Sequence, residues 1–96
     1  MAIHGLSEAE IGAELKKAAL WRREGNEIVR NFRFGGFGEA MRFVNAVAEQ
    51  AEKADHHPDI LIQYSQVTLR LSTHDANGLS ERDFAFARAV DGFGPQ

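Results

Sequence analysis

The spacing of apolar residues changes along this chain, and that change most constrains the fold. Ile11, Leu15 and Ala18 recur at intervals of three or four residues, as on one face of an α-helix. From residue 27 to residue 34 the side chains instead alternate between two faces, as in a β-strand. Helical spacing returns from residue 37 to about residue 54, so the chain switches between the two kinds of element.

Helix ends carry recognisable capping residues. Ser7-Glu8-Ala9-Glu10 is a capping-box pattern, which predicts that the first helix begins there and ends before Trp21. Ser80-Glu81-Arg82-Asp83 opens a last helix in the same way, and Gly92 is expected to end it.

Turn residues separate the strands. Gly25-Asn26 predicts a tight turn between a short strand near Trp21 and the strand at 27–34. Pro58 cannot continue the long helix, and two further strands follow at about 60–64 and 67–71, joined around Ser65-Gln66. The predicted order is helix, strand, strand, helix, strand, strand, helix. This order indicates an α+β fold, with a four-stranded antiparallel sheet and three helices packed on one face.

Composition narrows the class of protein. A chain of 96 residues is expected to form a single domain, residues 1–96, that gains stability from self-association. The absence of cysteine excludes disulfides, thiolate catalysis and cysteine-based zinc sites. A net charge of -3 argues against a nucleic-acid binder. Neither a signal peptide nor an apolar run long enough to cross a bilayer is present, which predicts a cytoplasmic protein.

Three of the four histidines lie in a short polar stretch of the sequence, between Glu52 and Asp83. His56 and His57 sit at the helix-to-strand junction, where both can face one cleft, and His74 follows the last strand. Imidazole is the side chain whose ordinary pKa lies closest to neutral pH, so such a cluster favours acid–base chemistry.

Other interpretations of these residues stay open at this point. Each histidine could be a junction residue bonded to backbone, or the cluster could bind zinc or iron, although its spacing matches no familiar metal motif. Asp83 could serve only to complete the capping box after Ser80. Trp21 and Tyr64 could be core or interface aromatics, and Glu52 could fix a histidine tautomer.

Longer segments match a known family. The matching runs are Asp55-His56-His57-Pro58-Asp59-Ile60, Tyr64-Ser65-Gln66-Val67-Thr68-Leu69, Leu71-Ser72-Thr73-His74-Asp75 and Gly78-Leu79-Ser80-Glu81-Arg82-Asp83-Phe84. Together with Trp21, the 30–34 strand and the 37–55 helix, they closely resemble the pterin-4a-carbinolamine dehydratases. Departures are small: Asn77 stands where glycine or alanine is common, and Ser65 where asparagine is common.

The resemblance implies a fold and a reaction. The fold is a four-stranded antiparallel sheet with three helices, assembled into homodimers or homotetramers. The reaction is the removal of water from 4a-hydroxytetrahydropterin to give quinonoid dihydropterin, a step of tetrahydrobiopterin recycling. No metal or organic cofactor is implied, because the pterin is itself the substrate, and neither nucleic acid nor membrane is an expected partner.

The resemblance also implies roles for individual residues, without saying which histidine is the acid and which the base. The implied catalytic residues are His56, His57, His74 and Asp83. The implied substrate-binding residues are Asp55, His56, His57, Ser72, Thr73, His74, Asp75, Glu52 and Trp21. Two other functions remain as alternatives: a binding module that acts as dimerisation cofactor of a partner protein, and a diverged homologue acting on a molybdopterin-type ligand.

Overall fold

The computed structural model of the protein describes residues 4–94. The elements in chain order are α1 (Glu8–Lys17), β1 (Arg22–Glu24), β2 (Glu27–Arg33), α2 (Phe37–Ala54), β3 (Asp59–Gln63), β4 (Gln66–Leu71), a 3-10 turn η1 (His74–Ala76) and α3 (Glu81–Asp91). The four strands form one sheet in the order β1-β2-β4-β3, with every neighbouring pair antiparallel. This arrangement confirms the α+β fold predicted from the sequence.

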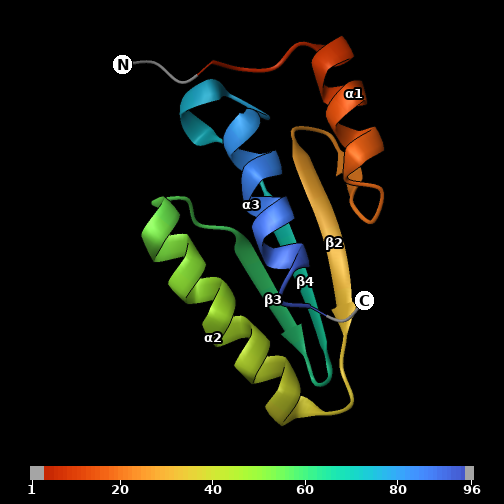
Figure 1. Ribbon diagram of the computed structural model, residues 1–96, viewed down its shortest axis with the longest axis vertical. Helices are drawn as coiled ribbons and strands as arrows, with labels where there is room; N and C mark the ends of the chain where they lie inside the picture. Colours follow the sequence, from red (N-terminus) through yellow and green to blue (C-terminus); the bar gives the residue numbers. More distant parts are fainter. Residues whose placement is uncertain (1–3, 95–96) are drawn as a thin grey trace.

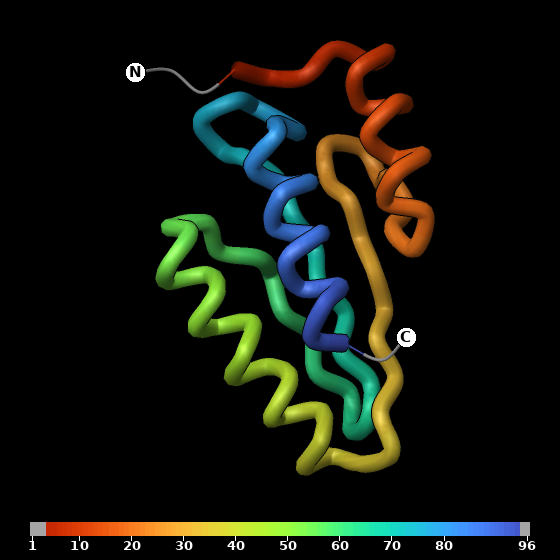
Figure 2. Tube along the Cα trace, in the orientation of Figure 1, coloured from red at the N-terminus to blue at the C-terminus, as the bar shows by residue number. Residues whose placement is uncertain are grey.

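The helices of the protein gather on one face of the sheet. α2 and α3 run across that face, and α1 lies at one end, beside the turn between β1 and β2 (Figure 1). The Cα trace shows the C-terminal end of α2, the η1 turn and the N-terminal end of α3 at the same end of the sheet (Figure 2). The segments that carry His56, His57, His74 and Asp83 therefore lie near one another.

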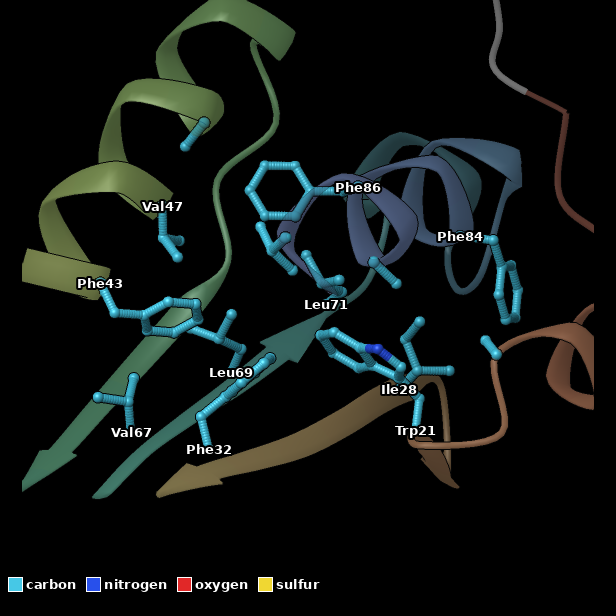
Figure 3. Packing of buried hydrophobic residues seen from close by; sticks show 14 of the residues in the cluster. Trp21, Ile28, Phe32, Phe43, Val47, Val67, Leu69, Leu71, Phe84 and Phe86 are labelled. Atoms are coloured by element: carbon cyan, nitrogen blue, oxygen red, sulfur yellow. The ribbon is translucent and has the colours of Figure 1, made fainter. Parts of the chain in front are cut away.

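The hydrophobic core fills the space between the helices and the sheet (Figure 3). Alternate residues of the two central strands point into it, because Ile28 pairs with Leu71 and Phe32 with Val67 in the register of β2 and β4. Phe43 from α2 packs on Phe32, with ring centroids 4.5 Å apart, and α3 adds further apolar side chains to the same core. The core thereby holds both helices in a defined position over the sheet.

Element ends differ by a few residues from those predicted. The turn between β3 and β4 consists of Tyr64 and Ser65, and Gln66 is already the first residue of β4. Tyr64 takes a left-handed backbone conformation, with a φ of 54°, which closes the turn one residue earlier than the sequence indicated. The strand predicted near Trp21 begins at Arg22.

Within residues 4–94, no helix combines the length and apolar character needed to cross a membrane.

Candidate active site

The C-terminal end of α2 determines where the first two histidines point. Asp55 caps the helix in the left-handed conformation, with φ 48° and ψ 47°, and the backbone N–H of His56 donates to the carbonyl oxygen of Ala51 at 3.1 Å. This reversal turns His56 inward, where it is 8% exposed, and leaves His57 exposed. The two neighbouring imidazoles thus have different surroundings and do not share one partner.

His56 forms a buried pair with a carboxylate from the start of α3. Its Nε2 lies 2.6 Å from Oδ1 of Asp83, which is 27 residues further along the chain. Asp83 has no solvent-exposed surface. A carboxylate buried this completely needs hydrogen-bond donors, and the imidazole supplies one of them.

The second oxygen of Asp83 is also fully engaged. Oδ2 accepts from the hydroxyl of Thr73 at 2.8 Å and from the backbone N–H of Ser80 at 2.9 Å. The contact with Ser80 is the capping box predicted for α3. The two interpretations of Asp83 are therefore compatible, because one oxygen caps the helix while the other holds His56.

His57 pairs with Glu52, one turn back on α2. Its Nε2 lies 3.0 Å from Oε2 of Glu52, and both side chains are largely exposed to solvent. A carboxylate in this position can fix the tautomer of the ring and its orientation.

His74 is the first residue of η1, and its side chain is exposed. It lines a pocket of about 310 Å³ with Asn26, Ser72, Thr73, Asn77 and Gly78. Among the described residues, its side chain makes no hydrogen bond or ion pair, so both ring nitrogens are free to meet a ligand.

A second pocket, of about 190 Å³, opens beside His56. Gln50 and Ala54 of α2 line it from one side, and Arg82, Ala85 and Phe86 of α3 from the other. The guanidinium of Arg82 also donates to the carbonyl oxygens of Ala54, at 3.0 Å, and Asp55, at 2.5 Å. Arg82 thereby ties the end of α2 to the start of α3.

Trp21 bonds to the end of α3 opposite Asp83, the partner of His56. It is buried in the core, and its Nε1 donates to Oδ1 of Asp91 at 2.9 Å, where Arg30 also donates. Asp91 ends α3 whereas Asp83 lies in its first turn, so about 12 Å of helix separates the two carboxylates. Asp55 and Asp75 are exposed at the end of α2 and in η1.

Within residues 4–94, no group of three or more histidine, aspartate or glutamate side chains is arranged to hold a metal ion. The carboxylates nearest the histidines each face a single ring, as the pairs of His56 with Asp83 and of His57 with Glu52 show.

Comparison with known proteins decides the family. The family model described as "Pterin 4 alpha carbinolamine dehydratase" matches residues 4–93. The chain belongs to this family. A protein of Chloroflexus aurantiacus, named "Putative pterin-4-alpha-carbinolamine dehydratase", is 56% identical over 86 residues, which cover 90% of this chain and 92% of that protein. A protein of the same name from Novosphingobium aromaticivorans is 46% identical over 95 residues, 97% of this chain and 99% of that one.

Solved structures of related proteins share the fold. A "transcriptional coactivator/pterin dehydratase" from Brucella melitensis superposes with a TM-score of 0.89 at 34% identity, covering 94% of this chain and 98% of that chain. A "pterin dehydratase-like protein", described as a RuBisCO assembly factor in the alpha-carboxysome, gives a TM-score of 0.66 at 28% identity, covering 75% of this chain and 86% of that chain.

Several residues of this candidate site were not singled out from the sequence. Arg82 and the hydroxyl of Ser80 were read only as parts of a helix start, yet both bond to the segments that carry the histidines. Asn26 comes from the β1–β2 turn and reaches the pocket of His74. Its position in a turn gave no signal of this contact, because nothing local to Gly25-Asn26 specifies what packs against it.

Proposed function

We propose that the protein is a dehydratase that removes water from 4a-hydroxytetrahydropterin and releases quinonoid dihydropterin. The observation that carries this proposal is the buried pair of His56 and Asp83, in a chain that belongs to the pterin carbinolamine dehydratase family. A solvent-exposed histidine, His57, follows directly in the chain, and His74 follows Thr73, which bonds to the same Asp83. The site therefore offers several imidazoles at one end of the sheet.

The reaction needs proton transfer and little else. The lone pair on N5 of the pterin expels the hydroxyl group from C4a, forming the N5–C4a double bond. The departing oxygen takes up a proton and leaves as water, while the proton on N5 is lost to a base. His56, His57 and His74 are the groups we assign to these transfers, because imidazole both donates and accepts protons near neutral pH.

We place the pterin between two segments of the chain. Residues 55–57, at the end of α2, form one wall, and residues 72–75, between β4 and α3, form the other. Backbone groups of these segments would bind the ring edge, and Glu52 would orient His57 from behind. We propose that no resident metal or cofactor takes part, since both protons can be handled by imidazole.

Self-association is part of the proposal. β3 is an edge strand, because it pairs with β4 alone, and Leu61, Ile62 and Tyr64 on or just after it are exposed. Unpaired backbone groups beside apolar side chains favour association with a second copy. We expect a homodimer or homotetramer by multi-angle light scattering, and a monomer at micromolar concentration would contradict this expectation.

A binding module is the alternative function. The titles of the two solved structures name a transcriptional coactivator and a RuBisCO assembly factor, so relatives with this fold are described in such roles. In a binding module, the hydrogen bonds around Asp83 would only stabilise the fold, and His56 would transfer no proton. The two functions are therefore separated by whether the protein accelerates dehydration.

The experiment is a stopped or continuous assay with freshly generated 4a-hydroxytetrahydropterin. The protein should raise the rate of quinonoid dihydropterin formation above the spontaneous rate, in proportion to its concentration. A folded His57→Ala/His74→Ala double variant is the control for catalysis by the site. Dehydration at the spontaneous rate with the parent protein would reject the enzyme and favour the binding module.

A further inference from the structure

With Asp83 as a carboxylate, the hydrogen bonds around it admit only one arrangement of protons. The hydroxyl oxygen of Thr73 lies 2.8 Å from Oδ2 of Asp83 and 2.5 Å from the hydroxyl oxygen of Ser80. A carboxylate can only accept, and a hydroxyl group has a single proton to give. Thr73 must therefore donate to Asp83, and Ser80 must donate to Thr73.

The same chain of donors continues on both sides. The hydroxyl oxygen of Ser80 accepts from the backbone N–H of Arg82 at 3.2 Å, and the backbone N–H of Ser80 donates to Oδ2 of Asp83. Thr73, Ser80 and Asp83 are 2%, 1% and 0% exposed, so water does not compete for these bonds. The Thr73 hydroxyl and the Ser80 backbone N–H both donate to Oδ2, and Oδ1 is left facing Nε2 of His56.

The charge on Asp83 then determines the tautomer of His56. If the proton of a neutral imidazole were on Nδ1, the lone pair of Nε2 would face an oxygen lone pair at 2.6 Å, away from water. With the proton on Nε2, the same contact is a charge-assisted hydrogen bond. Among residues 4–94, nothing bonds to Nδ1 of His56, so this atom keeps an unengaged lone pair.

We infer that the Asp83 carboxylate, fixed in its orientation by Thr73 and Ser80, holds the proton of neutral His56 on Nε2, and that Nδ1 is the atom that exchanges protons with the substrate. The part that concerns the substrate rests on the function proposed above. Thr73 and Ser80 are positioning residues in this inference, since they act on His56 through a carboxylate. When Nδ1 takes up a proton, the resulting imidazolium faces a buried carboxylate that is already oriented toward it.

The position of Thr73 connects this device to the other histidine pocket. Thr73 lines the pocket of His74, and its backbone is held there by the N–H donated to the carbonyl oxygen of Gly78 at 2.7 Å. Its side chain faces Asp83 and thus His56. Thr73 therefore lines the pocket of His74 while its hydroxyl bonds to the carboxylate that faces His56, and a side chain with a hydroxyl proton to donate suits this position.

The first test measures the tautomer directly and needs no substrate. Two-bond proton–nitrogen correlation spectra of protein labelled with ¹⁵N-histidine report which ring nitrogen carries the proton. At a pH where His56 is neutral, the parent should show its proton on Nε2. A proton on Nδ1 in the parent would overturn the inference, whether or not any variant folds.

Variants then test the two hydroxyl groups. Thr73→Val keeps the shape of the side chain and removes one of the two donors that orient the Asp83 carboxylate, so the hydrogen bond from Nε2 of His56 should weaken and the resonance of its proton should shift upfield. The kcat should fall about 10- to 100-fold, by analogy with the loss of partners that orient metal-bound imidazoles. The KM should change little, and Thr73→Ser should restore both the resonance and kcat. An unchanged resonance and kcat in folded Thr73→Val would reject the role of Thr73.

Ser7 offers a matched control for Ser80. Both residues cap a helix through a capping box, but Ser7 is exposed at the start of α1 and bonds only within its own turn. Ser80→Ala should shift the resonance of the His56 Nε2 proton and lower kcat, whereas Ser7→Ala should cost similar capping stability and leave both unchanged. An equal effect of the two changes would show that capping alone is involved. If dehydration is absent while the tautomer behaves as described, the proposed function fails and the positioning role stands.

Discussion

Replacement of Asp83 by asparagine is the sharpest probe of the site, because it keeps the shape of the side chain and changes one oxygen into a donor. The amide oxygen can still accept from Thr73 and from the backbone of Ser80 only if it takes the place of Oδ2. The amide NH₂ then faces Nε2 of His56 and donates to it. Asp83→Asn should therefore move the proton of neutral His56 to Nδ1, which can then no longer accept a proton from the substrate.

The expected effect is large on activity and moderate on stability. General acid–base assistance is worth about 10²–10⁴-fold, so kcat should fall by an amount in this range while KM changes little. Three charge-assisted hydrogen bonds become neutral ones, at about 1 kcal/mol each, so the free energy of unfolding should fall by about 3 kcal/mol or less. If Asp83 only caps α3, the loss of stability is about 1 kcal/mol or less and activity is unchanged.

Alanine is a poorer choice at this position. Asp83→Ala would leave the donors of His56, Thr73 and Ser80 buried without an acceptor, at about 1–3 kcal/mol each. The sum is comparable with the whole stability of a small domain, about 5–15 kcal/mol. The asparagine variant should be compared with the parent by urea unfolding and by the dehydration assay. A folded Asp83→Asn protein with the kcat of the parent would refute the reasoning that joins Asp83 to the reaction.

Three further predictions concern the histidines, metals and acid. His57→Ala and His74→Ala should each lower kcat substantially and leave residual catalysis, while the double variant should approach the spontaneous rate; a folded double variant as active as the parent would exclude these residues from catalysis. Activity should survive EDTA, and a loss that zinc or iron restores would reveal a metal-dependent reaction. Hydrogen bonds from arginine side chains hold the pKa of three glutamates below the ordinary value of 4.5. Arg23 bonds to Glu8, Arg70 to Glu24 and Arg88 to Glu81. Each of these ionised glutamates contributes stability above pH 4.5, and this stability is lost as the pH falls through the lowered pKa. The urea concentration at the midpoint of unfolding should therefore decline below about pH 4.5, and high salt should make this decline smaller. A midpoint that rises below pH 4.5 would contradict the assignment.

Local sequence was sufficient for the order of helices and strands. The capping boxes at Ser7 and Ser80 and the turn at Gly25-Asn26 all occur where they were predicted. These features depend on residues only a few positions apart, whose backbone preferences and hydrogen bonds act within one turn. The turn at Tyr64-Ser65 was misplaced by one residue, because a tyrosine with positive φ has no distinctive local signal.

The partners within the site could not be derived from local sequence. Asp83 could be recognised as the end of a capping box, but its contact with His56 spans 27 residues and depends on how α3 packs beside the end of α2. The same packing brings Arg82 to the carbonyl oxygens of Ala54 and Asp55. Resemblance to the family indicated that these residues act together, without indicating which atoms meet.

The sequence by itself determined the element types and the histidine-rich segments, because periodicity, caps and turns are properties of neighbouring residues. Only the tertiary structure decided that His56 is buried against Asp83, that His57 turns outward to Glu52, and that His74 lines a separate pocket. It also decided that Trp21 lies in the core and bonds to Asp91, at the opposite end of α3 from the carboxylate that faces His56. The physical reason is that burial and partner choice depend on the register of the sheet and the seating of α2 and α3 on it, which residues far apart in the chain specify together.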